Sequence, residues 1–375
     1  MSVISDFKPI VLVFGKLPPP YIGPSVATQI LLRSKLREEF DIVHFDLSDH
    51  RNYKTLGKID LMNFWIAFRQ YFLLPWYLAR YRPDLVYMPF GQTTVSYYRD
   101  SVFLLLIKLF MKKVVCHLRG GNFDNWYRGA SVFTRWYVRR IHSLVDAQII
   151  LGENLRHLFN WLMPDSRIFV VPNGGNFPIP EVRKRDGIFR ALFLGNLLES
   201  KGVVDFLKAS EIIALSGYRD TEFVLAGENR EARTVEFIDR FIREHPDVRV
   251  RMPGPLAGED KFRLLAECDV LVFPTYYVNE GHPWVIVESM AAGLPVISTD
   301  HAVIPETVSD GENGFLVPKK DPEAIAEKVI RLIEDPELRE RIGKRSREIY
   351  REKFTEEIMV EKMSSVFHKV LSGLS

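Results

Sequence analysis

The chain of 375 residues contains few cysteines and no apolar run as long as the roughly 18–20 residues that span a bilayer. Its two cysteines, Cys116 and Cys268, exclude a disulfide framework and fit a reducing cytoplasm. The stretch MSVISDFKPIVLVFG has no charged region before its apolar run, which predicts a first strand and not a signal peptide. No Asp-x-Asp pair and no Cys/His cluster occurs, so we expect no bound metal and no cofactor.

The overall charge is nearly balanced, with 50 Lys and Arg against 48 Asp and Glu, but the two halves differ. Residues 1–185 carry 25 basic and 14 acidic side chains, whereas residues 186–375 carry 25 and 34. The first half also contains 30 of the 46 aromatic residues. We therefore expect the two halves to contact different partners.

Short apolar runs alternate with amphipathic segments of helical length along the whole chain. Runs of four to six residues rich in Val, Ile and Phe are typical of parallel strands buried on both faces. In the first half these runs are Ile10–Phe14, Ile42–Phe45, Leu85–Met88, Val114–His117, Ala147–Leu151 and Ile168–Val171. In the second half they are Ala191–Leu194, Phe223–Ala226, Val248–Arg251, Val270–Phe273, Pro295–Ser298 and Gly314–Val317. Repeated strand–helix–strand units predict an α/β fold with doubly wound sheets.

The length predicts two domains, and the pattern of strands restarts near residue 190. We place the boundary in the polar stretch PIPEVRKRDG, which gives domains at residues 1–180 and 188–354. Residues 355–371 have apolar side chains near helical spacing and predict a last helix. The strand ends of the two domains are expected to face a central cleft, where ligands of such sheets bind.

The most informative motif is VFPTYYVNEGHPWVIVESMAAGLPVIST, residues 272–299. A strand is followed by a loop with Glu280, by Pro283 at the expected first helical position, and by a helix that contains Glu288. Glu288 stands among apolar residues, where an unpaired carboxylate is costly. Free N–H groups at this helix start, together with the two carboxylates, suit sugar hydroxyls and a ribose diol.

The frame E-G-x-P-x-x-x-x-E-S-M-A-A-G-L-P-V-I resembles the donor-site signature of family-four glycosyltransferases, retaining enzymes of the GT-B fold with two Rossmann-like domains. Further segments in the same order resemble the family: VVPNG (170–174), FLGNLLESKG (193–202), VLAGE (224–228), CDVLVFPT (268–275) and DGENGFLVP (310–318). The resemblance implies that the second half binds the nucleotide sugar, that the first half binds the acceptor, and that residues 355–375 cross back to the first domain.

The resemblance assigns roles to individual residues. Glu280 would contact hydroxyls of the donor sugar, Glu288 the nucleotide ribose, and Lys201 the diphosphate. Asn196 stands where the family has an arginine, so one cation facing the diphosphate is missing. The expected donor-binding residues are Gly23, Asn196, Lys201, Gly281, His282, Pro283, Trp284 and Glu288, and the expected catalytic residues are His117 and Glu280.

The first half departs from the family in one loop. Residues 15–25, GKLPPPYIGPS, have Gly23 followed by Pro24 where the family has two glycines, so one backbone donor is absent. His117 matches a family histidine that approaches the donor sugar. Arg119, two residues on, could bind phosphate or an anionic acceptor.

The resemblance, together with the absence of an Asp-x-Asp pair, implies a metal-independent, retaining hexosyltransferase that uses a UDP- or GDP-sugar as substrate, in polysaccharide or glycolipid synthesis. Two alternatives remain: a sugar-nucleotide epimerase of the same fold, and a non-catalytic nucleotide-sugar-binding subunit. The segments 59–82, 101–113 and 126–140 combine aromatic residues with cations, which predicts peripheral binding to an anionic membrane surface on its cytoplasmic face. No nucleic-acid motif is present, and we expect no nucleic-acid partner.

Overall fold

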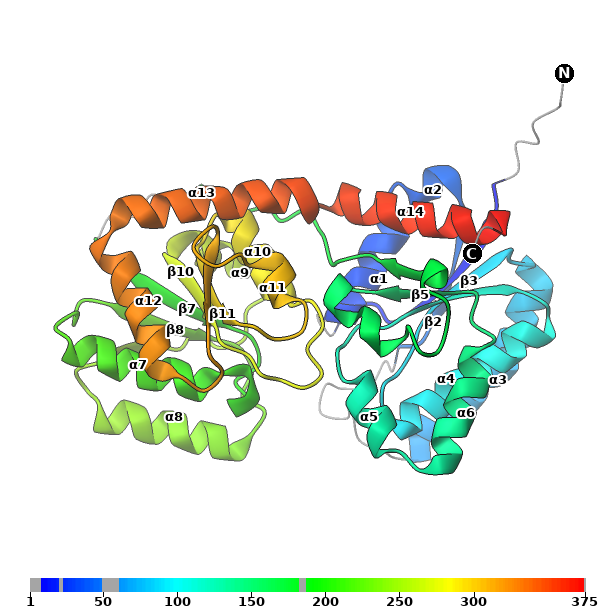
Figure 1. Cartoon of the computed structure of the whole chain (residues 1–375), viewed down its shortest axis with the longest axis horizontal. Coiled ribbons are helices and arrows are strands. Elements are labelled where there is room, and N and C mark those ends of the chain that lie inside the picture. The colour runs from blue at the N-terminus through cyan, green and yellow to red at the C-terminus, as the bar shows by residue number, and fades with distance from the viewer. Residues whose placement is uncertain (1–7, 20–22, 49–60, 182–186, 374–375) are drawn as a thin grey trace, which may run out of the picture. The chain divides into compact units, whose positions relative to one another are not determined.

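The computed structural model describes residues 8–19, 23–48, 61–181 and 187–373. The chain forms two compact units. Unit 1 spans residues 1–173 and 356–375, and unit 2 spans residues 174–355. Each unit contains one six-stranded sheet in which all the strand pairs are parallel, with helices on both faces (Figure 1). The predicted α/β class with two doubly wound sheets is confirmed.

In unit 1 the strand order is β2-β1-β3-β4-β5-β6. The strands are β1 (Ile10–Gly15), β2 (Asp41–Asp46), β3 (Leu85–Pro89), β4 (Lys113–His117), β5 (Ala147–Ile150) and β6 (Ile168–Val170). The helices are α1 (Gly23–Arg33), α2 (Leu36–Glu39), α3 (Leu61–Tyr81), α4 (Thr94–Leu109), α5 (Phe123–Gly129), α6 (Val132–His142) and α14 (Glu356–Ser372), with 3₁₀ turns at Glu153–Leu158 and Asp165–Arg167. The chain leaves β1 toward β2 and returns on the other side as β3, so the order reverses between β1 and β3.

The last helix, α14, belongs to unit 1 although it is last in the sequence. Its apolar face, with Met363 and Phe367, shares a buried cluster with Val11 and Val13 of β1. Lys113 of β4 donates hydrogen bonds to two carbonyl groups in the last turn of α14, at 2.8 and 2.9 Å. Helices α1, α2 and α14 cover one face of the sheet, and α3, α4 and α6 cover the other (Figure 1).

In unit 2 the strand order is β12-β11-β10-β7-β8-β9. The strands are β7 (Arg190–Leu194), β8 (Glu222–Ala226), β9 (Arg249–Arg251), β10 (Val270–Phe273), β11 (Val296–Thr299) and β12 (Gly314–Val317). The helices are α7 (Val203–Leu215), α8 (Ala232–Glu244), α9 (Gly258–Glu267), α10 (Trp284–Ala292), α11 (Ile304–Thr307), α12 (Pro322–Glu334) and α13 (Pro336–Lys353). The 3₁₀ turn η4 (Glu199–Lys201) lies between β7 and α7. Here the order reverses between β7 and β10.

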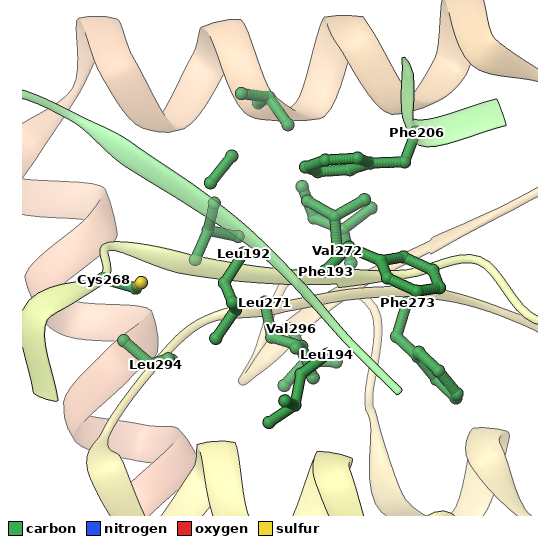
Figure 2. Close-up of a cluster of buried hydrophobic side chains, with 14 of the residues drawn as sticks. Leu192, Phe193, Leu194, Phe206, Cys268, Leu271, Val272, Phe273, Leu294 and Val296 are labelled. Atoms are coloured by element: carbon green, nitrogen blue, oxygen red, sulfur yellow. The ribbon is translucent and has the colours of Figure 1, made fainter. Parts of the chain in front are cut away.

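The core of unit 2 is built from the central strands (Figure 2). Phe193 of β7, Phe206 of α7 and Phe273 of β10 are nearly or completely buried. The ring centre of Phe193 lies 5.9 Å from the ring centre of each of the other two. Such close packing fixes the positions where β7 and β10 end. Because ligands of open α/β sheets bind beyond the carboxyl ends of the strands at the point of reversal, the loops after β7 and β10 are the first place to seek a site.

Candidate functional site

The loop after β7 carries Lys201 to the end of β10. Gly202, the next residue, has a φ of +88°, a conformation that glycine adopts without strain. A Cβ atom at this position would lie 2.5 Å from the carbonyl oxygen of Pro274, just past the end of β10. The loop can therefore approach β10 this closely only because residue 202 is glycine.

Lys201 and Glu280 form an ion pair at this point of reversal. The Lys201 ammonium bonds to Glu280 Oε2, and Thr275 Oγ1 donates to the same oxygen at 3.2 Å. The exposed fractions of the Lys201 and Glu280 side chains are 15% and 10%, so both charges are largely removed from water. Both of these bonds are made to Oε2. No described residue bonds to Oε1 of Glu280, which leaves that oxygen for a hydroxyl group of a ligand.

Aromatic rings hold the Lys201 ammonium in place. Lys201 Nζ lies 4.6 Å from the ring centre of Tyr277 and 5.4 Å from that of Phe273, within the range of cation–π attraction. An ammonium group has three N–H donors, and Glu280 accepts from one of them. Lys201 is therefore a fixed cation that can also bind an anionic oxygen.

Glu288 lies on α10 and pairs with a different lysine. Lys261 of α9 donates to Glu288 Oε1 at 2.6 Å. Glu288 Oε2 is buried and has no hydrogen-bond partner among the described residues. Burial raises the pKa of this carboxyl group above its ordinary value, although Lys261 opposes the rise. A buried acceptor without a partner is costly, and a ligand hydroxyl group would satisfy it.

The residues at the start of α10 differ in part from the prediction. The helix begins at Trp284, and Pro283 precedes it with an extended ψ of 121°, so Pro283 is not the first helical residue. His282 is 3% exposed, and its ring centre lies 5.2 Å from that of Phe354. Burial lowers the pKa of His282 to about 3, so the imidazole is neutral at physiological pH. Gly281 is buried, and Trp284 is partly buried.

Asn196 lies in the loop between β7 and Lys201. Its backbone carbonyl accepts a hydrogen bond from Leu198, and it is partly exposed. The flanking residues Gly195 and Leu197 donate to carbonyl groups at the end of β8 and just beyond it. The backbone of this loop is thus held against a second strand end.

In unit 1, His117 and Arg119 share a buried tyrosine. Tyr87 of β3 is 1% exposed, and its hydroxyl oxygen lies 2.8 Å from His117 Nδ1 and accepts from Arg119 Nη2 at 2.6 Å. Burial, reinforced by the charge of Arg119, lowers the pKa of His117 well below its ordinary value. We infer that the Tyr87 hydroxyl donates to His117 Nδ1, because no other acceptor for its hydrogen is found among the described residues, and this assignment places the histidine proton on Nε2.

The protonated Nε2 of His117 is buried and has no hydrogen-bond partner among the described residues. It is a neutral donor at the carboxyl end of β4. Such a group can donate to a hydroxyl oxygen of a sugar. Gly23, the remaining residue of the predicted set, is the first residue of α1, and Pro24 is the second.

Three residues that bond to the predicted site residues were not themselves predicted from the sequence: Thr275, Lys261 and Tyr87. Thr275 stands in the strand-end motif that contains Glu280, so its position was a usable signal. Lys261 and Tyr87 gave none, because each meets its partner only through the pairing of elements about thirty residues apart. Within the described residues, no three His, Cys, Asp or Glu side chains form a group that could hold a metal ion. Over the same residues, no helix is both long and apolar enough to cross a bilayer.

Comparison with known proteins identifies relatives of the chain. The family model described as "Glycosyl transferases group 1" matches residues 179–349. The capsular polysaccharide biosynthesis glycosyltransferase CapM of Staphylococcus aureus is 32% identical in an alignment of 263 residues that covers 65% of this chain and 67% of CapM. The N-acetyl-alpha-D-glucosaminyl L-malate synthase of Bacillus anthracis is 26% identical over 61% of this chain and 58% of that enzyme.

Solved structures share the fold over nearly the whole chain. Anabaena HepE, determined in complex with UDP, has a TM-score of 0.73 at 17% identity and covers 96% of this chain and all of its own. The sucrose-phosphate synthase of Thermosynechococcus elongatus has a TM-score of 0.74 at 19% identity and covers 98% of this chain and all of its own. The family match and the identity to CapM agree with this fold, and the chain belongs to the glycosyl transferases group 1 family and has the GT-B fold.

Proposed function

We propose that the protein transfers a hexose from a UDP- or GDP-sugar to a glycan or lipid-linked acceptor in cell-envelope polysaccharide or glycolipid synthesis. The observation that supports this most directly is the arrangement at the β7–β10 reversal of unit 2. A fixed cation, Lys201, pairs there with Glu280, and nearby Glu288 has a buried oxygen without a partner among the described residues. Diphosphate, sugar hydroxyls and ribose hydroxyls need groups of these three kinds.

In the proposed reaction the bond between the anomeric carbon and the diphosphate oxygen breaks, and a bond to the acceptor oxygen forms on the same face. The acceptor hydroxyl proton passes to the leaving phosphate oxygen. Lys201 binds the negative charge that grows on the diphosphate, and Glu280 binds hydroxyls of the transferred sugar. Glu288 binds the ribose, His117 Nε2–H offers a donor for a sugar hydroxyl oxygen, and no step requires a metal.

The backbone loops complete the proposed donor site. Asn196 offers an amide donor where a second cation is missing. The segment Gly281, His282, Pro283 and Trp284 places the N-terminus of α10 next to Glu280, and N–H groups at a helix start favour anionic and hydroxyl oxygens. Because the His282 ring packs against Phe354, only its backbone would contact the sugar.

The test uses the full-length protein and a panel of nucleoside diphosphates and nucleotide sugars. We expect thermal stabilisation by the matching nucleotide and sugar transfer to an acceptor or to water. Glu280→Gln should lower transfer by at least about a hundredfold, because a sugar contact that strengthens in the transition state is lost. Glu288→Gln should weaken binding of the nucleoside diphosphate. The exposed Glu244 provides the control variant Glu244→Gln, and undiminished transfer in both site variants would refute the proposal.

We further propose that unit 1 binds the cytoplasmic face of an anionic membrane. Helix α3 exposes Trp65, Phe68, Phe72 and Trp76, which recur every three or four residues, and more than half of each side chain is exposed. We call these four residues the aromatic face. Rings that are exposed along one side of a helix suit the interface of a bilayer.

Neighbouring helices add to this surface. Helix α4 packs between α3 and α6 on one side of the sheet. Helix α6 exposes Phe133 and Trp136 together with Arg139 and Arg140, and Arg135 of the same helix is partly exposed. Aromatic rings with arginines alongside match the apolar interior and the anionic head groups of a lipid surface.

A further inference from the structure

Unit 1 contains a pocket at the point where its own strand order reverses, between β1 and β3. Its volume is about 130 Å³. The lining residues are Phe14, Gly15, Lys16, Pro24, Thr28, Leu47, Gln70, Tyr87, Pro89, Arg99 and Arg119. They come from the ends of β1 and β3, from the segments after β1, β2 and β4, and from α1, α3 and α4. A reversal of this kind is where open α/β sheets bind ligands.

The charge of the lining is entirely positive. Three of the lining residues, Lys16, Arg99 and Arg119, are cations, and none of the eleven is acidic. A pocket lined by cations and by no acidic residue favours an anionic group of a ligand. Water occupies roughly 30 Å³ per molecule, so the pocket has room for a phosphate or carboxylate group.

Arg119 is the least compensated of the three. Its hydrogen bonds go to neutral oxygens, the Tyr87 hydroxyl at 2.6 Å and the Asn173 amide oxygen at 3.5 Å. It forms no ion pair with a described carboxylate. The Tyr87 bond fixes the guanidinium at the pocket wall, and a guanidinium fork still has donors for a two-pronged bond to phosphate or carboxylate.

Arg99 differs because it pairs with Asp100, at 2.7 Å. Asp100 is buried and also accepts from the backbone N–H of Gly91, at 2.8 Å, so its carboxylate is held by the fold. The Arg99 side chain remains 43% exposed. It is therefore anchored at one side and can still reach a ligand in the pocket.

We propose that this pocket binds a phosphate or carboxylate group of a substrate, with Arg119 as the principal contact and Arg99 and Lys16 as supporting cations. The proposal rests on the proposed function and adds to it a charged group that the substrate must carry. The group could belong to the acceptor, as an acidic or phosphate-bearing glycan, or to the donor diphosphate. The two sources have the same chemistry at the pocket and are separated by experiment.

The first measurement is calorimetric titration of the full-length protein with inorganic phosphate at low ionic strength, without donor or acceptor. We expect saturable binding that weakens at least about tenfold in Arg119→Gln and in Arg99→Gln, because each variant loses a charge-assisted hydrogen bond. Arg119→Lys should recover part of the affinity. Arg128→Gln is the control, because Arg128 is an exposed arginine of unit 1 outside the pocket.

The second measurement repeats the titration with UDP and GDP. If the acceptor supplies the anion, Arg119→Gln leaves nucleoside diphosphate affinity unchanged while phosphate affinity falls. If the donor supplies it, both affinities fall by a similar factor. Absence of phosphate binding in the wild type, or equal phosphate affinity in the wild type and both glutamine variants, overturns the proposal. Because the first titration uses no nucleotide sugar, this result is independent of whether the protein transfers sugars.

A folding defect is separated from a binding defect by the choice of variants. Arg119→Gln removes the bond to Tyr87, whereas Arg99→Gln removes the charge beside the buried Asp100 but keeps an amide that can donate to it, so thermal unfolding is measured for both variants. A loss of phosphate affinity shared by both variants, with unchanged thermal unfolding of Arg99→Gln, supports the pocket. A loss confined to Arg119→Gln with a lowered unfolding temperature contradicts it.

Discussion

Units 1 and 2 have the same kind of sheet, but one unit is rich in basic residues and the other in acidic residues. By sequence, unit 1 has 24 Lys and Arg against 16 Asp and Glu, and unit 2 has 26 against 32. Every exposed tryptophan or phenylalanine in the described part of the chain belongs to unit 1. The two units are thus built from similar helices and strands. Their surfaces differ in charge and in exposed aromatic rings because the side chains that do not pack on the sheet are different.

The points of strand reversal differ in the same way. In unit 2 the cation Lys201 is neutralised by Glu280, and a ligand must satisfy the pair and the nearby Glu288 oxygen. In unit 1 the cations at the reversal line a pocket without any acidic residue. The same topology can therefore present a balanced site, in which the cation is paired with a carboxylate, or a site lined only by cations, and local side chains decide between them.

The largest expected effect concerns the balanced site. Lys201→Gln should lower sugar transfer by about 10²–10³-fold, because a fixed cation at the growing negative charge of the leaving group is lost. Steady-state kinetics with the donor identified by the ligand panel measures the effect. Lys208→Gln, at an exposed lysine of α7, is the matched control. Equal loss in both variants would mean that the general charge of unit 2 matters, and not the pair.

The next effect tests how the unit 2 site is held. Gly202→Ala should reduce the free energy of unfolding by about 1–3 kcal/mol or more, since it adds a clash with Pro274 to an unfavourable φ. Gly217→Ala is the control, because Gly217 has a φ of +100° and no atom within 4 Å of an added Cβ. Urea unfolding of the two variants separates the clash from the backbone strain. Equal destabilisation of the two variants would show that the close approach of residue 202 to Pro274 is not the reason for a glycine at position 202.

A third prediction concerns the aromatic face of unit 1. Replacing Phe68 and Phe72 of the aromatic face by serine should lower binding to vesicles of anionic lipid by about tenfold or more, because the buried apolar area is lost. Co-sedimentation with vesicles measures it, and a parallel change of Leu215 in unit 2, which is 77% exposed, serves as control. Vesicle binding that ignores salt, anionic lipid and these residues would remove the contrast between the units.

The last prediction concerns acid stability, which depends on a buried histidine of unit 1 and not on a ligand site. Burial lowers the pKa of His142 in unit 1 to about 4, so between about pH 6.5 and 4 the unfolded chain takes up a proton that the folded chain does not. Stability from this group is present above pH 6.5, falls by about 1.4 kcal/mol for each pH unit between pH 6.5 and about pH 4, and does not fall further below that. His142→Gln should flatten the pH dependence of urea unfolding, while the exposed His157→Gln should keep its slope.

The sequence predicted the strands closely because a parallel strand buried on both faces requires a continuous apolar run. The run Ile10–Phe14 became β1, and Val270–Phe273 became β10 without change. Pro283 was placed one residue too far into the helix, because proline suits both the first helical position and the residue before it. Spacing alone does not choose between those two.

Sequence by itself determined the fold class and the strands, helix and loops that carry Glu280, Glu288, Lys201 and His117, because these depend on patterns within single elements and the loops that join them. Tertiary structure decided which charges meet. The Lys201–Glu280 pair joins residues 79 apart, and the lining of the unit 1 pocket runs from Phe14 to Arg119. Such contacts depend on the order of strands in the sheet, which brings distant strand ends together and which no local pattern encodes.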